Sequence, residues 1–154
     1  MLKPFPTILN NLKTFVLEVA NGANVVVKTT SNSIATGLNA TIKGVTFELG
    51  GANYHGFQHA EMINFVNCTF KGLLTTYGNH EFNNCKFIVE DYAYNANAYG
   101  MNITWNNCEF IGKGKAVYVY NEGGDMCHID FNNCKFTETG ITTKCKGAIM
   151  VKRN

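Results

Sequence analysis

The sequence predicts an all-β protein folded as a single-chain parallel β-helix, a solenoid whose successive turns stack on one another. Three observations lead to this prediction. A six-residue motif occurs four times, apolar residues alternate with polar ones inside each copy, and the alternation slips by one residue at the same asparagine in every copy. Alternation with a period of two indicates strands, and regular self-similarity indicates stacked repeats. We expect about six coils in one domain.

The repeated motif reads aromatic-x-Asn-Cys-x-Phe. Its four copies are residues 65–70, 82–87, 105–110 and 131–136. A diverged copy precedes them at residues 42–47, with Gly44 in the asparagine place and Val45 in the cysteine place. The copies recur at intervals of roughly 17 to 26 residues, which suits one turn of a solenoid with loops of variable length.

Each coil is expected to contain a strand, an asparagine corner and a second strand. Asparagine tolerates the left-handed backbone conformation that a sharp bend requires. A third strand must then close each coil. The candidates for this third strand are residues 73–77, 98–101, 116–120 and 148–151.

Stacking of the coils brings equivalent residues directly above one another, about 4.8 Å apart. Three internal columns follow. The asparagines should form a ladder in which each side-chain amide donates to the next one, which satisfies polar groups that burial would otherwise penalise. The columns are the asparagine ladder Asn67, Asn84, Asn107 and Asn133, the thiol column Cys68, Cys85, Cys108 and Cys134, and the aromatic column Phe70, Phe87, Phe110 and Phe136.

The two ends of the solenoid need separate treatment, because an open end exposes unpaired strand edges. Residues 1–22 are expected to be a capping segment, with a short helix over 7–15 that begins at Thr7 and packs Ile8, Leu12 and Phe15 on the core. Residues 23–154 form the β-helix. At the other end no cap is evident before Asn154, so we expect self-association or a partner there.

The motif copies and their vertical asparagine ladder resemble the right-handed parallel β-helix of the pectin-lyase-like superfamily, over about residues 23–154. The resemblance implies a right-handed, three-stranded coil. The superfamily contains polysaccharide lyases and hydrolases, phage tail spikes and surface or adhesion modules, so the resemblance leaves the activity open.

Composition narrows the class of partner. Charged residues make up 16% of the chain and the net charge is +2, with no basic stripe, so we expect no nucleic-acid partner. No apolar run is long enough to span a bilayer, so membrane insertion is not expected. No signal peptide is evident in residues 1–6. We expect the protein to act in the cytosol or in a virion. If the chain is part of a larger protein, we expect it at the cell surface or in a virion.

Chemistry-bearing residues are few. We interpret the column cysteines as small buried hydrophobes, and leave the redox state of Cys127 and Cys145 open. His55, His59, Glu61 and His80 are metal-ligand types, but we expect them in solvated turns and predict no metal. The carboxylates are scattered on strands, without the acidic cluster and basic partner that the resemblance would require of a lyase. We therefore predict no catalytic residues and no cofactor.

Tyrosines are the most informative surface feature. We predict a ligand-binding face for glycans, because aromatic faces and asparagine amides suit sugar rings. Its residues are Tyr92, Tyr94, Tyr99, Tyr118 and Tyr120. The prediction requires Val117 and Val119 to point inward, and it treats residues 91–97 as a polar loop beside the tyrosines.

The functional hypothesis is therefore a non-catalytic module for surface interaction or adhesion, binding a polysaccharide or other glycan through the tyrosines. Two alternatives stay open. One is an oligomeric structural component of a virus or phage, similar to a tail spike. The other is a polysaccharide lyase or hydrolase, or a fragment of one.

Overall fold

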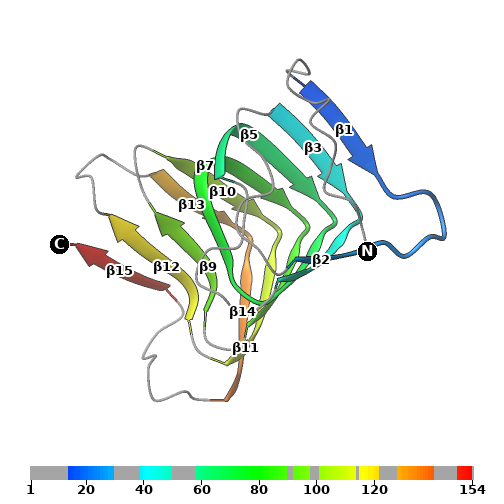
Figure 1. The fold of residues 1–154 in the computed structure, drawn as a ribbon. Coiled ribbons are helices and arrows are strands. Elements are labelled where there is room, and N and C mark those ends of the chain that lie inside the picture. The colour runs from blue at the N-terminus through cyan, green and yellow to red at the C-terminus, as the bar shows by residue number, and fades with distance from the viewer. Residues whose placement is uncertain are drawn as a thin grey trace.

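The fold is an all-β parallel solenoid. The computed structural model describes residues 14–29, 39–49, 58–89, 92–97, 101–113, 115–121, 128–140 and 149–153. Within these ranges every helix or strand element is a strand, and the paired strands run parallel in successive stacked turns (Figure 1). The predicted fold class is therefore confirmed at the level of a parallel β-solenoid.

The strands line up in three walls. The first wall consists of β1 (Thr14–Glu18), β3 (Asn39–Lys43), β5 (Gln58–Val66), β7 (Leu74–Asn83), β10 (Asn102–Asn106) and β13 (His128–Asn132). The second wall consists of β2 (Val26–Thr29), β4 (Thr46–Leu49), β6 (Thr69–Lys71), β8 (Lys86–Val89), β11 (Glu109–Lys113) and β14 (Lys135–Gly140). The third wall consists of β9 (Tyr92–Asn97), β12 (Lys115–Asn121), β15 (Ile149–Arg153) and the beginning of β7, which pairs with β9.

The number of complete turns differs from the prediction. The described strands support about three turns, rather than six. The prediction counted motif copies, which mark only the first and second walls. The third wall is joined by the pairings of β7 with β9, β9 with β12, and β12 with β15. The chain that follows β2 and β4 lies outside the described residues, so a third wall is not described for the earliest turns.

The corner between the first two walls is built as predicted. All four motif asparagines adopt a positive φ of 53°, at Asn67, Asn84, Asn107 and Asn133. Gly44, in the asparagine place of the diverged copy, has a φ of 74°. The backbone N–H groups of the corners up to Asn107 reach the next turn; that of Asn84, for example, donates to the carbonyl of Asn106 at 2.9 Å. The corner therefore bends the chain and also hydrogen-bonds to its neighbouring turn.

The core consists of columns of like residues. On the second wall, ring centroids lie 4.7 to 5.2 Å apart with nearly parallel planes along Phe47, Phe70, Phe87, Phe110 and Phe136. On the first wall, the spacing is 4.8 to 5.5 Å along Phe65, Phe82, Trp105 and Phe131. The two columns meet edge to face, as at Phe65 and Phe70 with centroids 5.2 Å apart. Stacked and T-shaped geometries are both favourable for aromatic pairs.

Two local predictions were wrong. The helix expected over 7–15 is contradicted at Thr14 and Phe15, which belong to β1. The rest of that segment lies outside the described residues, and a cap is not confirmed. Pairing of β1 with β3 begins at Thr14, inside the segment assigned to the cap. The third strand expected at 98–101 is formed instead by β9, and most of the expected polar loop 91–97 lies in that strand.

The predicted strand at 116–120 corresponds to β12 and that at 148–151 overlaps β15. The strand expected at 73–77 corresponds to the first part of β7. These matches show that short apolar alternation was a sufficient signal where valine, isoleucine or leucine was present.

Gly72, in the turn between β6 and β7, offers a direct test of how closely the turns approach. Its φ is 97°, and a Cβ built there would lie 2.5 Å from the carbonyl oxygen of Leu49 in the previous turn. We expect Gly72→Ala to lower the free energy of unfolding by more than about 2 kcal/mol, because the backbone would have to separate. Chemical denaturation measures this change.

The matched control is Gly22→Ala. Gly22 also has a positive φ, of 77°, but a Cβ there meets nothing within 4 Å. We expect Gly22→Ala to lower the free energy of unfolding by only about 1 kcal/mol, the cost of the strained backbone conformation. Equal costs at the two positions would contradict the close contact between turns at Gly72.

Candidate functional site

Two of the predicted tyrosines, Tyr118 and Tyr120, occupy positions in β12 that alternate with Val117. Val117 is fully buried, as the sequence prediction required. The register pairs Tyr118 with Asn95 and Tyr120 with Asn97 on the neighbouring strand β9. Because successive positions in a strand belong to opposite faces, the two tyrosine positions fall on the face opposite to Val117.

The other predicted tyrosines are placed differently. Tyr94 of β9 pairs in register with Val117, and Tyr92 pairs with Lys115. Tyr94 therefore does not share a column with Tyr118 or Tyr120. Tyr99 lies outside the described residues. The structure thus divides the predicted tyrosine face into two sets of strand positions.

An asparagine ladder is present on the first wall. The Nδ2 groups of Asn83, Asn106 and Asn132 donate to the Oδ1 atoms of Asn64, Asn83 and Asn106, at 2.8 to 2.9 Å. Among the corner asparagines, Nδ2 of Asn133 donates to Oδ1 of Asn107 at 2.8 Å. The corner side chains are exposed rather than buried, so their main structural contribution is the left-handed bend. In this ladder Asn83, Asn106 and Asn132 end their strands just before the corners, whereas Asn64 lies two residues before the end of β5.

The cysteine column links each turn to the preceding one. Thiols of the column point at backbone carbonyls; Sγ of Cys85 lies 3.5 Å from the oxygen of Phe65, and Sγ of Cys108 lies 3.4 Å from that of Phe82. Cys68, Cys85 and Cys108 are buried, Cys134 is partly buried, and all four are free thiols. Hydrogen bonds with the thiols of Cys108 and Cys68, together with burial, raise the pKa of Cys85. Cys127 and Cys145 lie outside the described residues.

His80 is the residue that the sequence analysis placed wrongly. It was expected in a solvated turn, yet its side chain is 1% exposed in β7. Its register partners are Ile63 and Ile103, and its ring lies about 6 Å from those of Phe65 and Phe82. Within the part of the chain that the structure describes, neither ring nitrogen has a hydrogen-bond partner. Burial lowers the pKa of His80 to about 3, so the imidazole is neutral near pH 7.

The other histidines carry no comparable feature. His128, at the start of β13, is exposed. His55 lies outside the described residues, and His59 lies in β5. Among the described residues, no three histidine, cysteine or carboxylate side chains gather as a metal site would require.

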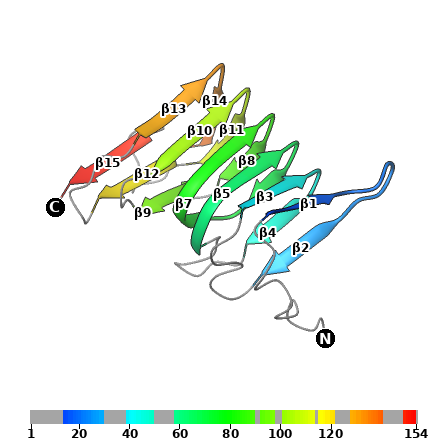
Figure 2. The ribbon, with the colours of Figure 1, turned by 90° about the horizontal axis from the view of Figure 1, so that it is seen from above.

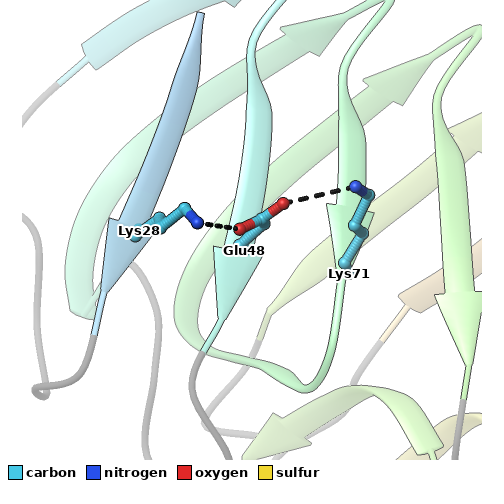
Figure 3. Close-up of polar contacts among 3 residues, drawn as sticks. All are labelled: Lys28, Glu48 and Lys71. Carbon is cyan, nitrogen blue, oxygen red and sulfur yellow. Dashed lines mark hydrogen bonds and ion pairs between the residues drawn. The ribbon is translucent and has the colours of Figure 1, made fainter.

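Several of the described carboxylates bridge neighbouring turns. Figure 3 shows Glu48 of β4 between Lys28 of β2 and Lys71 of β6, at 3.0 and 3.3 Å. Hydrogen bonds from Lys28 and Lys71 hold the pKa of Glu48 below its ordinary value of 4.5. Sequence reasoning missed this arrangement, although the three residues share one register column and could have been aligned.

The same arrangement recurs further along the second wall. Glu109 lies between Lys86 and Lys135, at 3.8 and 3.7 Å. On the first wall, Oε1 of Glu81 accepts hydrogen bonds from Asn83 and Asn106, both at 3.2 Å. These side chains bridge neighbouring turns, and exposed ion pairs of this kind stabilise a fold only slightly.

The comparisons with known proteins do not assign a family. The chain matches no protein-family model, no curated protein and no solved structure. Within the described ranges no helix could cross a membrane. The fold and its ladders define the chain as a parallel β-solenoid protein with free, buried thiols on its corner.

The buried histidine predicts a pH-dependent stability. The pKa of His80 is about 3 in the folded protein and about 6.5 when unfolded, so protons bind preferentially to the unfolded chain. Its neutral form stabilises the fold fully above pH 6.5, and this contribution is lost as the pH falls toward 3. From pH 7.5 to pH 5, we expect the free energy of unfolding to fall by about 2 kcal/mol.

Urea denaturation across that pH range measures the effect. His80→Leu should flatten the profile, whereas His128→Gln, at an exposed histidine, should leave it unchanged. A wild-type profile that is flat between pH 7.5 and pH 5 would show that His80 is not buried as described.

Proposed function

We propose that this chain is a non-catalytic binding module of the surface or adhesion type, a right-handed β-helix of the pectin-lyase-like kind that holds glycans on its third wall. The observation that carries the proposal is the register of Tyr118 with Asn95 and of Tyr120 with Asn97. It sets aromatic and amide positions side by side on adjacent strands, on the face opposite to the buried Val117.

The chemistry of these residue types fits a carbohydrate. A sugar ring has an apolar face, which packs on an aromatic ring, and a rim of hydroxyl groups, which hydrogen-bond to side-chain amides. Neighbouring strands lie about 4.8 Å apart, so a tyrosine and an asparagine in register can contact the same sugar unit.

The state of the carboxylates supports binding over hydrolysis. Glycoside hydrolysis requires two carboxyl groups about 5 to 9.5 Å apart and available to the substrate. Glu48 and Glu109 are held by lysines on both sides, and Glu81 is hydrogen-bonded by two asparagines. A polysaccharide lyase or hydrolase is therefore the weaker proposal.

A second candidate function is a structural component of a virus or phage. It is supported by the last described turn, where Phe136 of the aromatic column is 37% exposed and Ile149 is 45% exposed. Apolar surface at the end of a stack favours assembly with further protein.

Substitution of the β12 tyrosines tests the proposed function. We expect wild type to bind at least one polysaccharide in a glycan array, and Tyr118→Ala with Tyr120→Ala to weaken that binding by at least about tenfold, through loss of the aromatic stacking. Isothermal titration with the best array ligand measures the change.

Two control variants separate stacking from folding. Tyr118→Phe with Tyr120→Phe keeps the rings and should retain most of the affinity. Tyr92→Phe changes a tyrosine in the other set of positions, on the face of Val117, and should leave the affinity unchanged. Unchanged binding in the double alanine variant would contradict the assignment to β12.

A further inference from the structure

The corner hydrogen bonds of the solenoid run in one direction and leave complementary groups at its two ends. Each corner N–H donates to the carbonyl that precedes the next corner, from Val19 to Lys43 at 3.1 Å through Asn107 to Asn132 at 2.8 Å. If the series continued by one more turn beyond Asn107, the N–H of Asn133 would donate to a carbonyl in that further turn. At the opposite end, the carbonyl of Glu18 occupies the acceptor position ahead of the first corner.

A second series of backbone hydrogen bonds runs beside the first. Its donors point toward the preceding turn rather than the following one. The N–H of Thr46 donates to the carbonyl of Val25 at 3.0 Å, and the pattern repeats as far as Lys135 and Cys108 at 2.9 Å. Continued by one step at each end, this series would use the carbonyl of Cys134 in the last described turn and the N–H of Val26 in the first. The last corner therefore offers one donor and one acceptor, and the first corner offers the matching acceptor and donor.

The apolar columns end in the same complementary way. The first-wall column begins at Leu17, which is 41% exposed, and ends at Phe131. The second-wall column begins at Val27 and ends at Phe136, which is 37% exposed. A further turn placed on the last one would continue both columns if it carried apolar residues at these two positions, as the first turn does.

We propose that a second copy of this chain occupies this end, with its β1 and β2 paired in parallel on β13 and β14 of the first copy. Figure 2 shows β1 and β2 at one extreme of the stack and β13 and β14 at the other. Leu17 then packs on Phe131 and Val27 on Phe136, while Asn133 donates to Glu18 and Val26 donates to Cys134. The inference does not rest on the proposed glycan binding.

This contact is heterologous, because the two surfaces that meet are different. Heterologous contacts without rotational closure produce open chains of subunits rather than a closed dimer or trimer. The proposal therefore predicts a mass that keeps rising with protein concentration. A side-by-side trimer, as in the tail-spike hypothesis, would instead reach a fixed mass.

Glu138 limits the strength of the contact. It lies in β14 two residues after Phe136, on the same side of the strand, and is exposed. A charge on the inward side of an edge strand disfavours edge-to-edge pairing, because association would remove it from water. Glu138→Val should therefore strengthen the association.

Two blocking variants test the proposal on the full chain. Leu17→Asp places a charge on the first-turn surface and Phe136→Asp places one on the last-turn surface. Each alone should weaken association by at least about tenfold, because the contact would bury an unpaired carboxylate. Mixed in equal amounts, they should form a one-to-one heterodimer and nothing larger, because each retains one intact surface. Sedimentation velocity from micromolar to millimolar concentration measures this.

The controls are Val16→Asn and Thr137→Asn, which place an uncharged side chain of the same shape on the adjacent outward positions and should assemble like wild type. Asparagine is used because a carboxylate at position 16 would face Asp130 of the neighbouring copy. A wild type that stays monomeric at millimolar concentration would overturn the proposal. So would Leu17→Asp alone forming dimers, since that would indicate that like ends associate.

Cross-linking keeps the proposal testable if the aspartate variants do not fold. Val16 and Asp130 occupy one register column, at its first and last positions. They are five strand spacings, about 24 Å, apart within one chain, but adjacent across the proposed contact. In a Val16→Cys, Asp130→Cys variant a bis-maleimide shorter than about half that span should join different chains, and a ladder of cross-linked species is expected. Cross-linking no greater than in either single-cysteine variant would contradict the contact.

Discussion

The structure depends on one constraint, the stacking of like residues in register from turn to turn. Parallel strands repeat about every 4.8 Å, so each side chain meets its counterpart in the next turn at that distance. Flat rings suit this spacing, and the centroids of Phe87 and Phe110 lie 4.7 Å apart in nearly parallel planes. Asparagine suits it as well, because its amide both donates and accepts, as Asn106 does toward Asn83 and Asn132. The repeated motif is therefore a consequence of the geometry.

On the outer face of the second wall, charged side chains are also stacked in register from turn to turn. Like charges stacked at this spacing would repel one another, and lysines instead alternate with glutamates, as at Lys28, Glu48 and Lys71. The carboxylates of Glu48, Glu81 and Glu109 are thereby engaged in contacts between turns. The proposed binding positions, Tyr118 and Tyr120, lie on the third wall, in a different set of strands from these charge columns.

The sequence was informative where a residue type has only one structural use. Asparagine before cysteine predicted the left-handed corner, and Gly44 was recognised as its substitute. The third wall was harder to predict, because β9 is rich in tyrosine, alanine and asparagine and lacks a branched apolar alternation. His80 was misplaced, although it stands two residues before the motif aromatic, where the other copies have Ile63 and Ile103. Alignment of the copies at that position would have placed it in the core.

Backbone amide exchange at single-residue resolution, on dilute monomeric protein, tests the stacking most directly. The corner N–H groups of Asn67, Asn84 and Asn107 are hydrogen-bonded to the following turn, so they should exchange slowly, at rates set by opening of the stack. Among the described residues the N–H of Asn133 has no such acceptor in a following turn, so it should exchange far faster although its backbone conformation is the same. Equal, fast exchange at all four corners would contradict the in-register stack on which the fold depends.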